Sequence, residues 1–264
     1  MRKYILALAI AAGLLPIAGN AKAQYVYSAS EELSLFGYLN QRDPRITTAL
    51  GDNGCVPTSW VNSLNYFQNV NPSYFGSSLV GTSYQDWINT DLTLAGPKYL
   101  NTTSASGTSP LAIVPGLESY FSDLGFPGLS ITFQKLPSWN QLYQNLVSLS
   151  ATQLLLVPFE SGVGHAVSLV AINWDSNNSA INSFSYVDPE NPTTGSLPGS
   201  TLTTAPFANY NNGQDTVVAF YYPGTTDGYF IQGSVVVTIP EPSTYALFGL
   251  GAIALIVVYR RKVA

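Results

Sequence analysis

Two apolar segments, one at each end of the chain, bound the part that is left to fold. Two basic residues precede the first segment, Tyr4–Ile17, and the small-x-small triplet Ala21-Lys22-Ala23 follows it. This order is typical of a secretory signal peptide, which signal peptidase removes once the general secretion machinery has engaged it. An N-terminal membrane anchor is the alternative, but the run is short for one. We therefore expect residues 1–23 to be cleaved and the mature chain to begin at Gln24.

The second apolar segment, Tyr245–Tyr259, contains no charged residue and runs directly into a basic tail, Arg260-Arg261-Lys262. It is short for a membrane span of about 20 residues, but Ser243 and Thr244 can complete it at the interface. Basic residues next to a span stay on the cytoplasmic side. The sequence therefore predicts a single transmembrane helix with the bulk of the chain exported.

Pro240, Glu241 and Pro242 stand directly before this segment. Pro-Glu-Pro, an apolar helix and a basic tail in this order resemble the PEP-CTERM sorting signal, which occurs in Gram-negative bacteria with exosortase systems and extracellular polysaccharide. The resemblance covers residues 239–264. It implies a transient inner-membrane anchor, cleavage by exosortase near Pro240–Ser243, and transfer to the cell surface or extracellular matrix. A plain C-terminal anchor is the alternative.

Residues 24–238 remain as one expected domain. Between Gln24 and Ile239 the sequence has four basic and 14 acidic residues, a net charge of −10. This acidic balance excludes nucleic acid and anionic lipid surfaces as partners. The chain has one Cys and one His, which excludes an intramolecular disulfide framework, a multi-Cys zinc site and a multi-His metal site. We expect no metal or other cofactor.

Helical patterns come first in this domain and strand patterns come later, which predicts an α+β fold with helices packed on an antiparallel sheet. The expected helices are Thr58–Phe67, Tyr84–Leu94, Pro110–Leu124 and Trp139–Leu149. The expected strands are Leu129–Phe133, Leu154–Val157, Ala166–Ile172, Ile181–Val187, Thr216–Tyr222 and Tyr229–Thr238. Residues 101–109 and 191–210 are expected to be loops.

The single cysteine, Cys55, is placed by a proline two residues later. Pro57 fits only in the first turn of a helix, so Cys55 lies at a helix N-terminus, and Asp52 or Asn53 can cap that helix. The helix dipole favours a thiolate there, which is the reactive form of cysteine. The alternative is a buried cysteine that acts as a small hydrophobic residue.

The single histidine, His165, begins the predicted strand Ala166–Ile172, and Asp188 ends the next strand. The segment 175–178 between the strands is a turn signal. A hairpin centred between Ser176 and Asn177 sets His165 opposite Asp188, where a carboxylate can orient an imidazole as a general base. A histidine with only a structural role is the alternative.

Cys55, His165 and Asp188 occur in the order nucleophile, base and orienting acid. This order and the local sequences resemble the papain-like clan of cysteine peptidases, within it the bacteriocin-processing type, over residues Leu39–Pro189. The matching pieces are Asn53-Gly54-Cys55-Val56-Pro57-Thr58-Ser59, Gly164-His165-Ala166-Val167-Ser168-Leu169-Val170 and Val187-Asp188-Pro189. The resemblance implies a papain-like fold and a Cys-His-Asp triad that hydrolyses amide bonds in a peptide or protein.

The same family uses a glutamine shortly before the cysteine as an oxyanion donor, and here the sequence departs from it. Gln41 is fourteen residues before Cys55. It reaches the site only if residues 42–50 loop out; otherwise the Asn53 amide and the Cys55 backbone N–H take that role. Losing one oxyanion donor lowers the rate about 10²- to 10³-fold.

Three functions remain open on the sequence. The first is an exported thiol hydrolase, most simply a peptidase. The second is a non-catalytic papain-like module that binds peptide or extracellular polysaccharide, with tyrosines as stacking surfaces. The third is a structural protein of the matrix with no chemistry at Cys55 or His165. Reactivity of the thiol discriminates between them.

Overall fold

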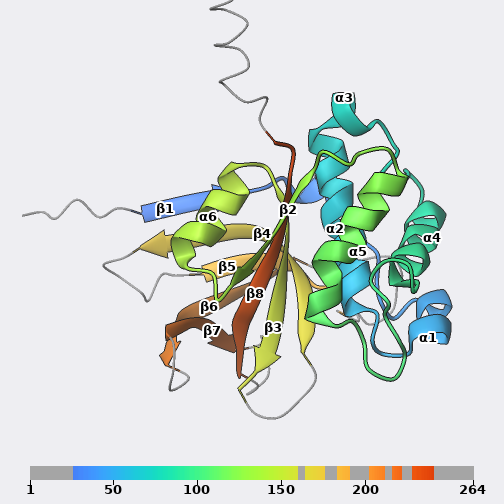
Figure 1. Cartoon of the computed structure of the whole chain (residues 1–264). Helices are drawn as coiled ribbons and strands as arrows, with labels where there is room; N and C mark the ends of the chain where they lie inside the picture. The colour runs from blue at the N-terminus through green and yellow to red at the C-terminus, as the bar shows by residue number, and fades with distance from the viewer. Residues whose placement is uncertain are drawn as a thin grey trace, which may run out of the picture.

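The computed structural model describes residues 26–159, 164–175, 183–190, 202–211, 216–221 and 228–240. Most of its helices come early in the chain and lie beside an antiparallel sheet (Figure 1). The helices are α1 (Pro44–Leu50), α2 (Cys55–Val70), α3 (Pro72–Phe75), α4 (Tyr84–Ala95), α5 (Pro110–Asp123) and α6 (Trp139–Val147), with a 3₁₀ turn at Leu33–Leu35. The α+β class predicted from the sequence is confirmed, with six of the eight strands in the second half of the chain after α6.

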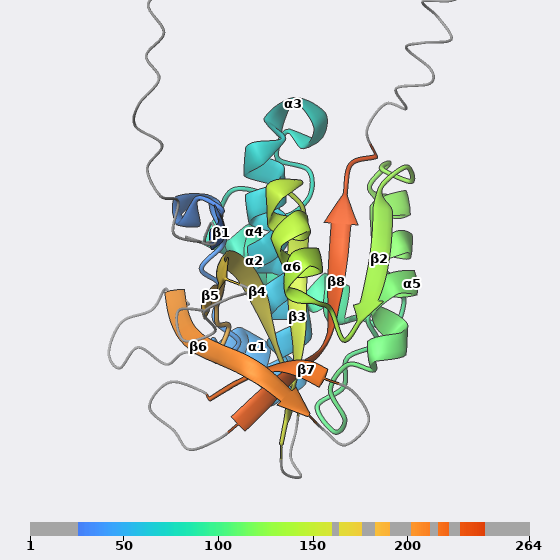
Figure 2. The same cartoon turned by 90° about the vertical axis from the view of Figure 1, so that its left-hand side faces the viewer.

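The strands form one curled antiparallel sheet. They are β1 (Val26–Ser30), β2 (Ser130–Lys135), β3 (Ala151–Pro158), β4 (His165–Asp175), β5 (Ser183–Val187), β6 (Leu202–Asn211), β7 (Thr216–Tyr221) and β8 (Gly228–Thr238). The order is β1-β4-β3-β8-β7-β6-β5, and β5 pairs again with β4, while β2 pairs with β8. The sheet therefore curls until its ladder closes on itself (Figure 2).

The two larger hydrophobic cores lie on opposite faces of the sheet, because successive side chains of a strand point to opposite sides. Leu155 of β3 and Ala166 of β4 pack against the helices α1, α2, α4 and α5. Their neighbours Leu154 and Val167 pack with α6 and with strands across the curl. The helix-covered face is the one that carries the start of α2.

Helix α2 is the central helix and is buried on every side, since all thirteen residues from Val56 to Gln68 are buried. Polar groups of the sheet fix its first turns: the Gln153 Nε2 donates to the Val56 carbonyl at 2.9 Å, and the Ser168 Oγ donates to the Ser59 carbonyl at 2.7 Å. These bonds hold the N-terminus of α2 against β3 and β4. Pro57 lies in the first turn, as the sequence predicts.

The sequence-based prediction of a loop at residues 191–210 is wrong for the part from Leu202, which forms β6. This strand pairs with β5 on one side and β7 on the other. Hydrogen bonds with these two strands stabilise it, although its own sequence lacks a strand pattern. Strand β1 and helices α1 and α3 were also not anticipated.

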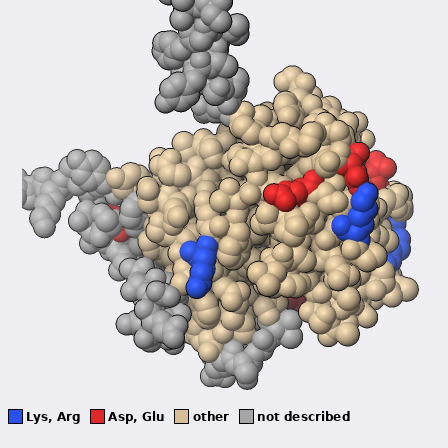
Figure 3. Space-filling model, viewed as in Figure 1, with Lys and Arg blue, Asp and Glu red and all other residues tan. Residues whose placement is uncertain are grey.

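The expected signal peptide, residues 1–23, and the expected transmembrane segment, Tyr245–Tyr259, lie outside the described residues. Within the part of the chain that the structure describes, no helix has the length and apolar character needed to cross a membrane. The face shown in Figure 3 is largely uncharged, and most of its charged side chains gather over the helices. A surface with few charges fits a protein with only 9% charged residues.

Candidate active site

Cys55 is the first residue of α2 and borders a cavity of about 560 Å³. It is a free thiol and is partly exposed, as a group that meets a ligand must be. No side chain caps the helix: Gly54 is the N-cap residue, so the predicted capping by Asp52 or Asn53 is wrong. Both of those side chains are held elsewhere, Asp52 by Arg42 and Asn53 by the carbonyl of Ser104.

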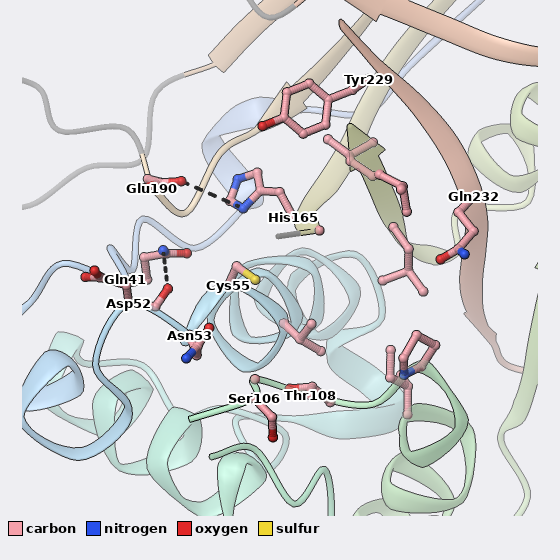
Figure 4. Close-up of a pocket in the computed structure, with 18 of the residues that line it drawn as sticks. Gln41, Asp52, Asn53, Cys55, Ser106, Thr108, His165, Glu190, Tyr229 and Gln232 are labelled. Atoms are coloured by element: carbon pink, nitrogen blue, oxygen red, sulfur yellow. Dashed lines mark hydrogen bonds and ion pairs between the residues drawn. The ribbon is translucent and has the colours of Figure 1, made fainter. Parts of the chain in front are cut away.

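His165 faces Cys55 from the first position of β4 (Figure 4). Its Nε2 lies 2.9 Å from the Asp188 Oδ1, and its side chain is 9% exposed. Burial is the largest single influence on its pKa and lowers it. Hydrogen bonds with Asp188 and with the Cys55 side chain, and the charges of both, outweigh burial and raise the pKa of His165 to about 10. The imidazole is therefore protonated at neutral pH.

The register predicted for the His165–Asp188 hairpin is wrong by two residues next to Val187 and by three beyond a bulge. The ladder pairs Val187 with Ser168, where the prediction paired Val187 with Ala166, and a bulge follows between Leu169 and Ala171. At the Val187 end, a shift of two residues leaves the side chains on their original face, because the side-chain period of a strand is two. His165 and Asp188 therefore still meet.

The Asp188 carboxylate is almost fully buried, with 2% of the residue exposed. Its Oδ1 accepts a hydrogen bond from the backbone N–H of Glu190 at 2.8 Å as well as facing the imidazole. Two partners thus fix the carboxylate, and the carboxylate fixes the ring. With Nε2 committed to Asp188, Nδ1 is the nitrogen left for Cys55.

Gln41 lines the same cavity as Cys55, because the residues between them leave as an excursion that contains α1. The backbone N–H of Gln41 donates to the Pro189 carbonyl at 2.8 Å, and its Nε2 donates to the Asp52 carbonyl at 3.4 Å. Its Oε1 is buried and has no hydrogen-bond partner among the described residues. From the sequence, Gln41 could reach the site only if residues 42–50 looped out, and the excursion that contains α1 does this.

The segment before Gln41 is held on α2 by asparagine side chains, of which Asn62 is the one nearest the site. The Asn62 Oδ1 accepts from the Leu39 N–H at 2.8 Å, and the Asn62 Nδ2 donates to the Leu39 carbonyl at 3.0 Å. A Cβ at Gly37 would lie 2.7 Å from the Asn62 Oδ1, so only glycine allows this approach. Gln41 is therefore positioned by the contact of Leu39 with α2 as well as by its own bonds to Pro189 and Asp52.

Asn53, the other candidate oxyanion donor, supports the cavity wall. Its Nδ2 donates to the Ser104 carbonyl at 2.7 Å. That bond steadies the loop whose residues Ser106, Gly107 and Thr108 border the cavity. In Figure 4 the Asn53 side chain points toward this loop rather than toward the sulfur. Gln41 is the better placed of the two amides.

The sequence analysis missed two charged residues of the site, Arg42 and Glu190. The Arg42 guanidinium forms ion pairs with Asp52 and with Glu190, and the Glu190 Oε2 lies 3.9 Å from the His165 Nδ1. In the sequence, only their positions could have indicated a role in the site: Arg42 follows Gln41, and Glu190 stands two residues after Asp188. The opposite wall is mostly apolar, with Val56, Pro110, Ile113, Leu155, Leu156 and Val157. The described residues include no group of three or more His, Cys, Asp or Glu that could hold a metal ion.

Residues 238–262, which begin at the last residue of β8, match the family model of the PEP-CTERM protein-sorting motif. The chain carries a PEP-CTERM sorting signal. This signal marks the protein for export and for exosortase-dependent sorting to the cell surface or extracellular space. No curated protein matches the chain. The PEP-CTERM signal thus indicates where the protein goes. What the domain does there depends on the residues around Cys55.

Proposed function

We propose that the exported domain, residues 24–238, is a papain-like thiol hydrolase that cleaves amide bonds in peptides or proteins. One observation carries the proposal: His165 is hydrogen bonded to Asp188 through one ring nitrogen and interacts with Cys55 through its side chain, beside a cavity. A cysteine nucleophile needs a base in reach and a third group that orients the base. Cys55, His165 and Asp188 take these three roles.

The reaction begins with Cys55 as thiolate and His165 as imidazolium. The sulfur attacks the amide carbonyl carbon and forms a C–S bond while the carbonyl oxygen takes up negative charge. When the C–N bond breaks, the imidazolium gives its proton to the leaving amine, and a thioester remains on Cys55. Neutral His165 then takes a proton from water, whose oxygen attacks the thioester; the C–S bond breaks, the carboxylic acid leaves, and the thiolate and imidazolium are restored.

Two N–H donors serve the oxyanion. The backbone N–H of Cys55 lies in the first turn of α2, where N–H groups have no partner within the helix. The Gln41 amide is the second donor, and its long bond to the Asp52 carbonyl, 3.4 Å, holds Nε2 only weakly. Rotation of the amide toward the sulfur brings Nε2 to the oxyanion.

The cavity supports a substrate class as well as a reaction. The wall formed by Pro110, Ile113 and Leu155 is apolar, whereas the side of His165, Arg42 and Glu190 is charged. The leaving amine must be near His165, which protonates it. An apolar group on the acyl side of the scissile bond therefore fits the opposite wall, because burial of apolar surface favours binding.

The second candidate is a non-catalytic module that binds a peptide in the same cavity. It is favoured by the resting arrangement of Gln41, whose Nε2 is bonded to Asp52 and whose unpartnered Oε1 is an acceptor rather than a donor. A pocket that only holds an N–H group of a ligand has no need of an oxyanion donor.

Turnover of a mixed peptide library by the released mature protein, followed by mass spectrometry, tests the proposal. We expect cleavage on the carboxyl side of apolar residues, with loss of cleavage in Cys55→Ala and His165→Ala. Ser106→Ala, which removes a hydroxyl from the cavity wall, is the control and retains cleavage. Binding of peptides without cleavage would replace the hydrolase by the binding module.

The sorting steps complete the proposed course of the protein. Signal peptidase removes residues 1–23, the segment Tyr245–Tyr259 holds the chain transiently in the inner membrane, and exosortase cuts near Pro240–Ser243. The hydrolase would then act at the cell surface or in the extracellular matrix of a Gram-negative bacterium. Extracellular polysaccharide is the surrounding medium and the alternative ligand.

A further inference from the structure

We propose that Arg42 is a positioning residue that ties the Gln41 side of the cavity to the His165–Asp188 side. The inference rests on the proposed thiol hydrolase. Arg42 has a half-buried side chain and borders the cavity. Of the described residues that line this cavity, it is the one Lys or Arg. Its two guanidinium nitrogens bind two carboxylates from different parts of the chain, Asp52 and Glu190.

The first arm of Arg42 closes the excursion that separates Gln41 from Cys55. Arg42 is its first residue and Asp52 stands three residues before Cys55, so the ion pair between them joins its two ends. The carbonyl of Asp52 also accepts the hydrogen bond from the Gln41 Nε2. The two ends of the segment between Gln41 and Cys55 are thus held together, and Gln41 is fixed relative to the start of α2.

The second arm of Arg42 holds the segment that follows Asp188. Its partner Glu190 donates a backbone hydrogen bond to the Asp188 Oδ1 at 2.8 Å. The preceding residue, Pro189, accepts the hydrogen bond from the Gln41 N–H at 2.8 Å. Through Arg42, the amide and the orienting carboxylate are therefore parts of one connected network.

Arg42 also limits how closely the Glu190 carboxylate approaches the histidine. The Glu190 Oε2 forms a long ion pair with the His165 Nδ1 at 3.9 Å, beyond hydrogen-bond distance (Figure 4). The Oε1 of the same carboxylate is held by Arg42. A carboxylate released from Arg42 is drawn to the imidazolium and competes with the Cys55 thiolate for Nδ1. Without Arg42, the Cys55 thiolate therefore shares the His165 Nδ1 with Glu190 and is less stabilised.

A planar guanidinium suits this task, because it presents several donors in a fixed fork and can bind two carboxylates at once. Ion pairs at partly exposed positions add little to folding stability. The two ion pairs of Arg42, with Asp52 and with Glu190, should therefore affect the reactivity of Cys55 much more than the free energy of unfolding. This difference separates a positioning role from a merely structural one.

The test measures iodoacetamide alkylation of Cys55 against pH, together with kcat and KM for a cleaved peptide, in the full mature protein. We expect Arg42→Ala to lower the alkylation rate at pH 6 about 10-fold and to lower kcat by about the same factor, since small misplacements of reacting groups cost up to about 100-fold. Arg42→Lys should not restore either value, because one ammonium cannot span both carboxylates. Adding Glu190→Gln to Arg42→Ala should recover the alkylation rate.

Arg45→Ala is the matched control. Arg45 pairs with Asp43 and Gln85 and does not line the cavity, so alkylation should stay at the wild-type rate. Wild-type alkylation and turnover in Arg42→Ala, or full rescue by Arg42→Lys, would overturn the proposal. If Arg42→Ala unfolds, Arg42→Lys decides alone, with reduced alkylation in support and wild-type alkylation against. Failure of the hydrolase proposal itself would show differently, as a wild-type protein that cleaves no peptide.

Discussion

The His165 Nε2 and the Asp188 Oδ1 lie 2.9 Å apart, although the β4–β5 ladder does not pair the two residues directly. Their side chains meet because both point to the same face of the sheet. The contact holds the imidazole with its other nitrogen toward Cys55 at the start of α2. Burial lowers the pKa of the ring, but the hydrogen bonds with Asp188 and Cys55 outweigh burial and raise the pKa of His165 to about 10.

The raised pKa predicts how the reactivity of Cys55 depends on pH. We expect iodoacetamide alkylation to remain appreciable well below pH 8, because a protonated His165 stabilises the thiolate. In His165→Ala the rate should fall off as for an ordinary thiol, whose usual pKa is about 8.5. Identical pH profiles in the two proteins would show that Cys55 is structural.

The free energy of unfolding should also depend on the protonation of His165. The folded pKa of His165, about 10, is above its ordinary value of 6.5, so its contribution is fully present below pH 6.5 and is lost as the pH rises through about 10. Urea unfolding of the wild-type protein should show declining stability over this range. Cys55→Ala and Asp188→Asn, which remove one partner each, should flatten the decline; an unchanged slope in both would contradict the assignment.

Gln41→Ala should lower kcat for peptide cleavage about 10²- to 10³-fold with little change in KM, because an oxyanion donor acts mainly in the transition state. The measurement is steady-state kinetics on one cleaved peptide. Gln232→Ala is the control, since Gln232 lines the same cavity but is exposed on β8. Equal effects of the two substitutions would remove Gln41 from the mechanism.

A second buried acid offers a stability test that is independent of the site. Burial raises the pKa of Glu31 to about 9, and a hydrogen bond with Tyr66 offsets only part of this. A raised carboxyl pKa means that stability is lost as the pH rises from the ordinary value toward 9; at pH 7 the cost is about 3 kcal/mol.

Glu31→Gln should therefore increase the free energy of unfolding at pH 8 and leave it unchanged at pH 4, as measured in urea. The neighbouring Glu32 has an exposed side chain, so Glu32→Gln serves as the control and should have little effect at either pH. A loss of stability in Glu31→Gln at pH 8 would show that the carboxyl group is needed in its charged form.

The sorting signal makes a prediction about mass. Protein released by the native host should lack Tyr245–Ala264, because exosortase cuts near Pro240–Ser243. Intact-mass analysis of secreted material measures this directly. Released protein that retains the complete C-terminal segment would indicate a route that does not use the PEP-CTERM signal.

Several features of the site followed from short stretches of sequence. Pro57 permits only a first-turn position, so Cys55 had to begin a helix, and α2 begins there. Ser138 and Gln141 form the capping box of α6, which was predicted to start at Trp139. The apolar run Leu154–Val157 is buried in β3 apart from its last, half-buried residue. These features were predictable because backbone sterics, end capping and side-chain periodicity act within a few residues.

Other features were decided only by tertiary contacts. The register of β4 and β5 differs from the one set by turn composition, and β6 exists because two neighbouring strands supply its hydrogen bonds. Gln41 reaches the cavity because Asn62 pins the chain before it and the Arg42–Asp52 ion pair closes the excursion after it. The sequence determined which residues have suitable chemistry and where their local elements begin. The tertiary structure decided which of them meet, because contacts between distant residues depend on strand pairing and loop closure, which short sequence patterns do not encode.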